Sequence, residues 1–289
     1  GEDGGSQHGA PWCVELSGFE GSRYGRVCVV PRGEEDQLDL SSQAQLEAVA
    51  STASVALDNE ARRVERDRAQ HSAILALARL AEKRDDDTGR HLERVSAYSR
   101  LIAESLRGRG LHVRLITDVW IEDLVRSAPL HDVGKVAIPD SILKKPGPLT
   151  NAEREVMKTH TTIGAATLEA AHVEGGARGF LEMGRDIALC HHERWDGGGY
   201  PRGSSGEEIP LSARILSLAD VYDALTTQRP YKEAWPHEEA LGWIRERGGT
   251  QFDPNVVASF LECAREFDAL RQQLADKDFA GKERAEAHG

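Results

Sequence analysis

Histidine and aspartate residues are grouped along this sequence in a way that suits a metal site. The grouped residues are the adjacent pairs His131-Asp132 and His191-His192 and the single histidines His91 and His160. Imidazole and carboxylate groups together are ligands that suit iron, manganese or zinc. A lone histidine is more often a hydrogen-bonded structural residue, so the prediction depends on the combination and not on any single residue.

The adjacent pairs favour a site with more than one ion. Neighbouring residues on a helix cannot face the same way, so one member of His131-Asp132 would bind one ion while the other bridges or binds its neighbour. Asp132 is the natural bridge because a carboxylate has two oxygens. Asp220 lies in the apolar segment 218–225, where an unpaired carboxylate would be destabilising. Binding of Asp220 to a metal would remove that penalty.

The order of these residues resembles the HD superfamily of metal-dependent phosphohydrolases. The segment His191-His-Glu-Arg-Trp-Asp-Gly-Gly-Gly-Tyr-Pro201 resembles the signature of its HD-GYP branch, in which Gly199-Tyr200-Pro201 is the naming triplet. Further similar segments follow in the family's order, at residues 138–144, 209–214, 229–232 and 249–254. The resemblance covers the chain from residue 80 to residue 265.

The resemblance implies an all-α fold, an HD-type helical bundle with metal ions at its centre. The residues that match the family's metal ligands are His91, His131, Asp132, His160, His191, His192 and Asp220. Asp132 and Lys135 match catalytic residues, and Lys135 is the lysine expected to contact the scissile phosphate. Arg229 and Lys232 match basic residues that bind the dinucleotide, and Tyr200 lies in the loop beside the pocket.

The implied activity is hydrolysis of cyclic di-GMP to linear pGpG, with GMP as the product of a second cut. Two divalent ions, Fe or Mn, would share a hydroxide that attacks the phosphodiester, and Lys135 would stabilise the developing charge. Another cyclic dinucleotide such as cyclic GMP-AMP stays open as the substrate. A non-catalytic module that binds a nucleotide or a partner stays open as well. The segment 191–201 disfavours a nucleotide phosphohydrolase of the wider superfamily.

One position departs from the family pattern, which often has glutamate four residues before the first histidine. This chain has Asp87 there, and in the family the position is linked to a third ion. Aspartate is one methylene shorter, so its carboxylate would fall short by about 1.5 Å. The sequence therefore predicts two tightly bound ions, with Asp87 at most a weak or water-mediated ligand of a third.

Helices are expected to position these residues. From residue 82 to about residue 275, apolar residues follow helical spacing between loops rich in Gly, Pro and Asp, and no convincing strand pattern occurs. Ser42 and Gln45 predict a capping box at the start of an upstream helix. That helix should continue to Lys83, because residues 61–70 are nearly all charged or polar yet contain no Gly or Pro. Residues 25–31 have the composition of a strand.

The predicted organisation has four parts. They are the C-terminal part of a GAF-like sensor domain over 1–60, a signalling helix or linker over 61–80, the HD-GYP domain over 81–275 and a flexible tail over 276–289. An ordinary N-terminal cap is the alternative for the first part. The apolar stripe through Leu57 and Val64, followed by Ile74 and Leu75, predicts a parallel homodimer. The loop at residues 199–201 is expected to offer a surface for a GGDEF-type or other signalling partner.

The bulk composition limits the classes of partner and location. The net charge of −12 argues against binding to nucleic acid, so an anionic substrate would need positive charge from metal ions and a few placed basic residues. There is no run of eighteen apolar residues, so no membrane span is expected. Four cysteines lie far apart without a CxxC spacing, which predicts reduced thiols in the cytoplasm and no disulfide framework.

Overall fold

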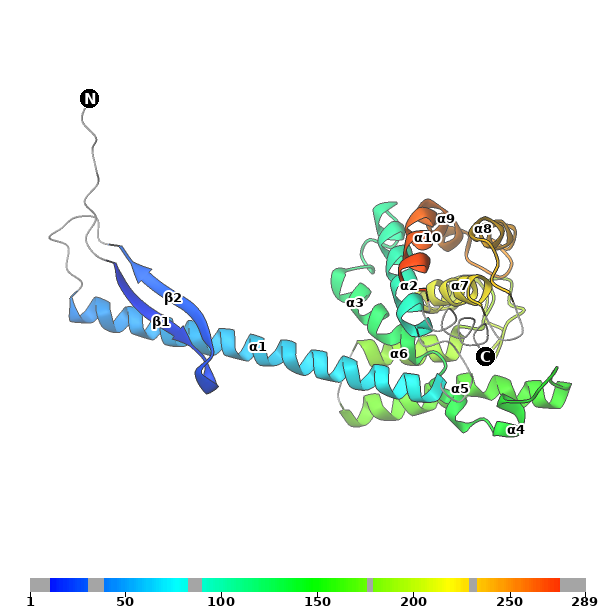
Figure 1. Ribbon diagram of the computed structural model, residues 1–289, viewed down its shortest axis with the longest axis horizontal. Coiled ribbons are helices and arrows are strands. Elements are labelled where there is room, and N and C mark those ends of the chain that lie inside the picture. The colour runs from blue at the N-terminus through cyan, green and yellow to red at the C-terminus, as the bar shows by residue number, and fades with distance from the viewer. Residues whose placement is uncertain (1–10, 31–38, 83–89, 176–178, 229–232, 276–289) are drawn as a thin grey trace, which may run out of the picture. The chain divides into compact units, whose positions relative to one another are not determined.

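A computed structural model describes residues 11–30, 39–82, 90–175, 179–228 and 233–275 of the chain. Almost all regular structure in these residues is α-helical (Figure 1), which confirms the predicted fold class. The chain divides into two compact units, residues 1–72 and 73–289. None of the described helices contains an apolar stretch long enough to cross a membrane.

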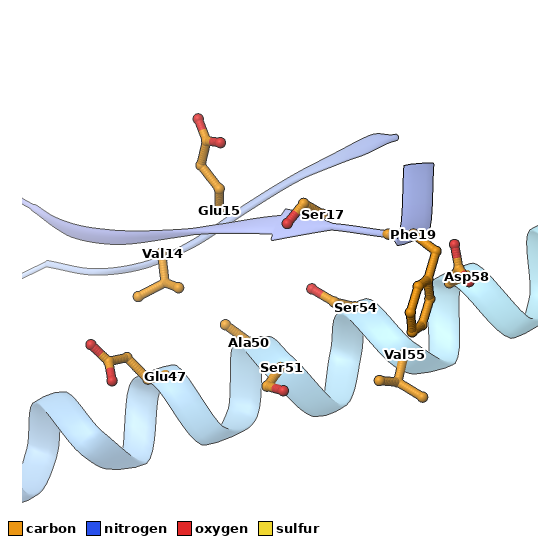
Figure 2. A pocket seen from close by; sticks show the side chains of 11 residues that line it. Val14, Glu15, Ser17, Phe19, Glu47, Ala50, Ser51, Ser54, Val55 and Asp58 are labelled. Atoms are coloured by element: carbon orange, nitrogen blue, oxygen red, sulfur yellow. The ribbon is translucent and has the colours of Figure 1, made fainter. Parts of the chain in front are cut away.

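The first unit contains an antiparallel hairpin of β1 (Trp12–Ser17) and β2 (Arg23–Val29), joined through the short 3-10 helix η1 (Phe19–Gly21). The predicted strand over residues 25–31 corresponds to β2, whereas β1 was not predicted. The hairpin covers one face of the following helix, and a pocket of about 370 Å³ lies between them (Figure 2). At its edge, the Tyr24 hydroxyl donates a hydrogen bond of 3.0 Å to the buried carboxylate of Asp58.

The hairpin contains a disulfide between Cys13 and Cys28. The prediction of reduced thiols was therefore wrong for this pair. The two cysteines are 15 residues apart, and the antiparallel register brings them directly opposite each other. Sequence spacing alone did not reveal this register. Cys190 and Cys263 are free thiols and both are buried.

The long helix α1 (Leu40–Glu82) runs without interruption from the first unit into the second, which confirms its predicted continuity. Its N-cap is Asp39, whose carboxylate accepts a hydrogen bond of 2.7 Å from the backbone N–H of Ser42. The predicted capping box at Ser42 and Gln45 was therefore misplaced by one turn. Asp39 directly precedes the first helical residue, so its carboxylate can accept a hydrogen bond from the backbone N–H three residues ahead. Ser42 already lies inside the first turn and cannot act as its N-cap.

The second unit is a bundle of helices (Figure 1). They are α2 (His91–Gly108), α3 (Asp118–Ser127), α4 (Asp140–Leu143), α5 (Asn151–Gly175), α6 (Phe180–Cys190), α7 (Leu211–Thr226), α8 (His237–Glu246), α9 (Pro254–Glu262) and α10 (Ala264–Gln273). Short 3-10 helices connect them at η2 (Ala128–Leu130), η3 (Val133–Ala137) and η4 (Gly206–Glu208). Among the described residues of this unit there is no strand, only one isolated β-bridge between Gly248 and Phe252.

Two apolar clusters hold the elements that carry the candidate site. The larger cluster packs α2 against α3, α7 and α9, and the rings of Tyr98 and Phe267 stack within it at 4.5 Å. The smaller cluster consists of Leu130, Leu168 and Ala188, with Ile74 of α1 packed against it. Burial of these side chains fixes the positions of η2, α5, α6 and the end of α1 relative to one another within the second unit.

Candidate metal centre

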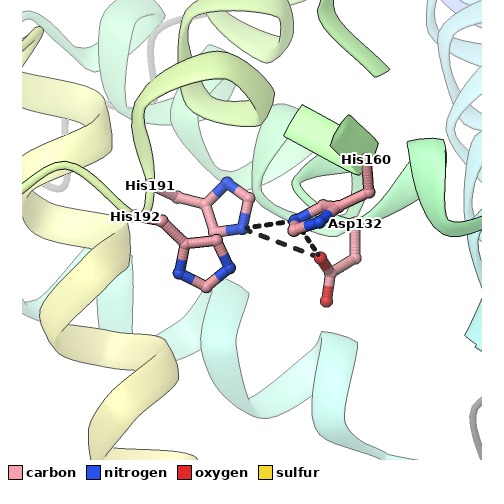
Figure 3. Close-up of side chains that lie close together, drawn as sticks. All are labelled: Asp132, His160, His191 and His192. Atoms are coloured by element: carbon pink, nitrogen blue, oxygen red, sulfur yellow. Dashed lines mark hydrogen bonds and ion pairs between the residues drawn. The ribbon is translucent and has the colours of Figure 1, made fainter. Parts of the chain in front are cut away.

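The bundle brings the seven predicted metal ligands together from five places in the sequence. They form two groups, Asp132, His160, His191 and His192 in the first and His91, His131 and Asp220 in the second. Within each group the candidate ligand atoms all lie within 4.8 Å of one another. Figure 3 shows the side chains of the first group pointing toward one another from α5, from the end of α6 and from the segment between η2 and η3.

Asp132 lies between the two groups. Its Oδ1 atom is 3.2 Å from Nε2 of His160 and 3.6 Å from Nε2 of His191, both in the first group (Figure 3). Its Oδ2 atom is 3.3 Å from Nε2 of His131, in the second group. The two oxygens of one carboxylate therefore face histidines of different groups. This geometry agrees with a bridging role for Asp132, which stays a prediction.

Backbone carbonyls orient three of the histidines. Nδ1 of His131 lies 2.9 Å from the carbonyl oxygen of Ala128, and Nδ1 of His160 lies 2.7 Å from that of Met157. Nδ1 of His191 lies 3.1 Å from the carbonyl oxygen of Ile187. A carbonyl only accepts hydrogen bonds, so each Nδ1 carries the proton and donates. Each Nε2 is left with its lone pair directed into the site, as a metal ligand requires.

Asp223 is a site residue that the sequence reasoning missed. It lies on α7 one turn after Asp220, and its Oδ2 atom is 2.7 Å from Nδ1 of His91. Its Oδ1 atom accepts a hydrogen bond of 2.6 Å from Arg94. The i,i+3 spacing of two aspartates in an apolar helix was the available signal, because both side chains then lie on the same face.

Burial and charge set the protonation of the first group. Burial alone would raise the pKa of Asp132, but Lys135 and His131 hold this pKa well below its usual range. The Lys135 ammonium lies 2.8 Å from Oδ2 of Asp132. Burial lowers the pKa of His191 and lowers that of His192 strongly. An ionised carboxylate and neutral imidazoles are the forms that bind metal ions.

Two glycines allow the close approaches on which the site depends. A Cβ on Gly134 would overlap the backbone carbonyl of His160 and lie 2.6 Å from the backbone N of Gly164. Without that Cβ, η3 packs directly on α5 and Asp132 reaches His160. A Cβ on Gly199 would lie 2.5 Å from the backbone of Glu193 and Arg194. The loop after His192 can therefore fold back on itself only with glycine there.

That loop places Tyr200 beside the first group. The ring of Tyr200 stacks on His192 with centroids 4.7 Å apart, and its backbone N–H donates a hydrogen bond of 3.2 Å to the carbonyl of His192. The ammonium of Lys158 lies 5.5 Å from the centre of the Tyr200 ring. Tyr200 is therefore next to the candidate ligands, as expected, while its contact with substrate stays a prediction.

Three predicted site residues lie outside the described residues. They are Asp87, the candidate third-site ligand, and Arg229 and Lys232, the candidate dinucleotide contacts. Their roles stay predictions.

The donor set fits divalent metal ions. Among the described residues, Nε2 of His131 and Oδ1 of Asp132 are buried polar atoms without a hydrogen bond. Buried polar atoms are nearly always satisfied, and a metal ion would satisfy both of these. Imidazole nitrogen and carboxylate oxygen also form the ligand mixture that first-row transition metals accept. The two groups could therefore bind divalent metal ions.

Comparison with known proteins agrees with this geometry. The HD domain family matches residues 75–256. The chain belongs to the HD domain family. This membership confirms the resemblance drawn from the motifs.

Curated relatives are similar to this chain over most of its length. A protein of Vibrio cholerae named "Cyclic di-GMP phosphodiesterase" is 46% identical over 241 residues, which cover 83% of this chain and 49% of the relative. A protein of Thermotoga maritima with the same name is 43% identical over 199 residues, covering 69% of this chain and 50% of the relative. The chain thus spans about half the length of the curated relatives it matches.

One solved structure has a similar fold. It is a crystal structure of cyclic GMP-AMP specific phosphodiesterases in V. cholerae, with a TM-score of 0.51 and 21% identity. The match covers 73% of this chain and 52% of that chain. At this level of identity the likeness concerns the fold alone.

Proposed function

We propose that this chain is a metal-dependent phosphodiesterase that hydrolyses cyclic di-GMP to linear pGpG, with GMP as the product of a second cut. The observation that carries the proposal is the position of Asp132, whose two oxygens face histidines of two adjacent candidate metal groups. Two ions that share one carboxylate suit an in-line attack on a phosphodiester. The names of the relatives described above point to the same substrate.

Each group would hold one ion. His160, His191 and His192 would bind the first, His91, His131 and Asp220 would bind the second, and Asp132 would contribute one oxygen to each. Iron or manganese suits this mixture of imidazole and carboxylate ligands. When bound, such ions act as Lewis acids that polarise phosphoryl oxygens and make water a stronger nucleophile at neutral pH.

The chain's own basic and aromatic residues would bind and orient the dinucleotide. The Lys135 ammonium lies beside the site, 2.8 Å from Asp132, where it can stabilise negative charge that develops on a phosphate. Tyr200 offers an aromatic face next to His192, and an aromatic face is a stacking surface for a base. Arg229 and Lys232 would bind phosphates or base edges. These placed charges would offset the net charge of −12 for an anionic substrate.

The activity is tested on the full chain purified without oxygen and loaded with Fe²⁺ or Mn²⁺. Cyclic di-GMP and cyclic GMP-AMP are supplied in parallel, and the products are separated by chromatography. We expect pGpG to appear first from cyclic di-GMP. Asp132→Ala should remove turnover and most bound metal, whereas the exposed Asp118→Ala on α3 should change neither. Full metal loading without cleavage of either dinucleotide would favour the non-catalytic binding module.

We also propose that the chain forms a homodimer through α1. Val49, Leu57 and Val64 are exposed apolar residues on this helix. Their spacings of eight and seven residues place them close to one face, and such a stripe is typical of paired helices. Light scattering at several protein concentrations tests the proposed dimer. A molar mass of the monomer at every concentration would contradict it.

A second interaction is proposed for the loop at Gly199-Tyr200-Pro201. Pro201 and the next residue, Arg202, are exposed, which makes them available to a GGDEF-type or other signalling partner.

The proposed location of the protein is the cytoplasm, where the free thiols Cys190 and Cys263 would stay reduced. The reducing conditions of the cytoplasm act against the Cys13–Cys28 disulfide. Counting the free thiols of the purified protein tests whether this disulfide is present.

A further inference from the structure

The last residue of α1, Glu82, lies at the second metal group. Its Oε1 atom is 3.8 Å from Nε2 of His91, and the side chains of Glu82 and His91 are 13% and 2% exposed. Nδ1 of His91 is engaged by Asp223, so Nε2 is the nitrogen available to a metal ion. On the same side, an oxygen of Asp220 lies 3.6 Å from this nitrogen. Two carboxylates therefore flank the ligand atom of His91.

We propose that Glu82 is an additional metal ligand, so that α1 itself supplies part of the metal centre. This inference rests on the metal dependence proposed above. With the oxygen that Asp132 would contribute, the group of His91, His131 and Asp220 offers two imidazoles and two carboxylates to its ion. Glu82 would add a fifth ligand, an oxygen that also carries negative charge, and an ion such as Mn²⁺ accepts up to six ligands in octahedral geometry.

The observed spacing is compatible with shared coordination. Ligand atoms lie about 2.0–2.2 Å from a metal such as zinc, so two ligands of one ion are roughly 3–4.4 Å apart. The separation of 3.8 Å between Glu82 and His91 falls in this range. Glu82 is not part of the group whose atoms all lie within 4.8 Å of one another. Coordination therefore requires a rotation of its side chain, which its three rotatable bonds permit.

The end of α1 is held against the elements that carry the ligands. Ile74 packs against the cluster of Leu130, Leu168 and Ala188. In that cluster, Leu130 lies one residue before His131 and Ala188 three residues before His191. One turn further along, Arg79 forms an ion pair of 2.6 Å with Glu93 on α2, the helix that begins with His91. The position of α1 along these contacts determines whether Glu82 can reach the ion. A shift of α1 would thus add or withdraw one ligand, which links this helix directly to the metal site.

The test measures metal affinity independently of turnover. Metal-free protein comprising the whole chain is titrated with Mn²⁺ against a competing chelator, and bound Mn²⁺ is followed by electron paramagnetic resonance. We expect Glu82→Gln to weaken one of the ions about tenfold or more, in the range seen for altered metal environments, and to change its spectrum. Glu65→Gln is the matched control, because it makes the same change at an exposed position of the same helix.

Two further variants separate the alternatives. Asp87→Asn should leave the affinity of this ion close to wild type if Glu82 is the ligand, and a loss only in Asp87→Asn would overturn the proposal. Arg79→Ala removes the ion pair with Glu93 and should weaken the same ion by a smaller factor than Glu82→Gln. Unchanged Mn²⁺ affinity and an unchanged spectrum in a folded Glu82→Gln protein would also overturn it. Wild-type protein that binds Mn²⁺ but cleaves no dinucleotide would contradict the proposed function and leave this result intact.

Discussion

His91 and Asp223 form a buried pair in which Nδ1 of the histidine lies 2.7 Å from Oδ2 of the aspartate. The same carboxylate accepts a hydrogen bond of 2.6 Å from Arg94, and all three side chains are almost completely buried. Burial alone would raise the pKa of Asp223, but His91 and Arg94 lower it, so the carboxylate is ionised at neutral pH. An ionised partner fixes the ring of His91 with Nε2 toward the second metal group.

The first prediction follows from this pair. Asp223→Asn keeps the size of the side chain but removes the charge that orients His91, so we expect metal affinity at the second group to fall about 10–100-fold. Chelator competition with Mn²⁺ measures this directly. Asp268→Asn, on α10 and paired with Arg271, is the matched control and should bind both ions normally. Wild-type affinity in Asp223→Asn would mean that the pair is only structural.

The candidate ligands could be predicted from sequence because each lies in a short motif of recognisable residue types. His131-Asp132, the pair at 191–192 and Asp220 all stood out in this way, and the structure brings them into two groups. The motif also predicted the helical fold of the second unit. The sequence also indicated Asp132 as a bridge, but it could not show which histidine each Asp132 oxygen faces, since that depends on how η3 packs against α5.

The features that were missed all depend on register or on distant contacts. The Cys13–Cys28 disulfide follows from the alignment of two strands, one of which had no clear sequence signal. Asp223 was hidden beside Asp220 in the same apolar helix, and its role becomes visible only when His91, 132 residues away, is placed next to it. Glu82 carries no signal in the sequence, because helical periodicity gives no information about what lies beyond the last turn of a helix.

A second prediction concerns Lys135. Its ammonium lies 2.8 Å from Asp132, and it is expected to act on the phosphate in the transition state rather than on the metal. Lys135→Ala should therefore keep its metal content while kcat falls on the order of 100-fold. Metal analysis and steady-state kinetics on the same sample separate the two effects, with Lys144→Ala, an exposed lysine paired with Asp140, as control. If Lys135→Ala lost both its bound metal and its catalytic rate, the role of Lys135 would be to hold the Asp132 carboxylate in place.

A third prediction uses the contact between η3 and α5. In Gly134→Ala the new methyl group would meet the backbone of His160 and Gly164, which cannot move aside as a side chain can. We expect overpacking to lower the free energy of unfolding by about 1–3 kcal/mol or more, and Asp132 to be displaced from His160 with loss of metal. Gly242→Ala on α8 is the control, because a Cβ there meets nothing within 4 Å. It should stabilise the helix by about 0.5–1 kcal/mol. Equal melting temperatures for the two variants would contradict the packing argument.

The fourth prediction concerns the four cysteines. Burial raises the pKa of Cys190 to about 11 and that of Cys263 to about 12. At pH 8 both groups are therefore almost entirely protonated, and the thiolate is the reactive form. Native protein should react slowly with a thiol reagent at pH 8, and the reaction should become faster as the pH rises toward these pKa values.

Denatured protein should show two thiols without reductant and four after reduction, because Cys13 and Cys28 are joined by a disulfide. Four thiols in freshly denatured, unreduced protein would contradict the disulfide.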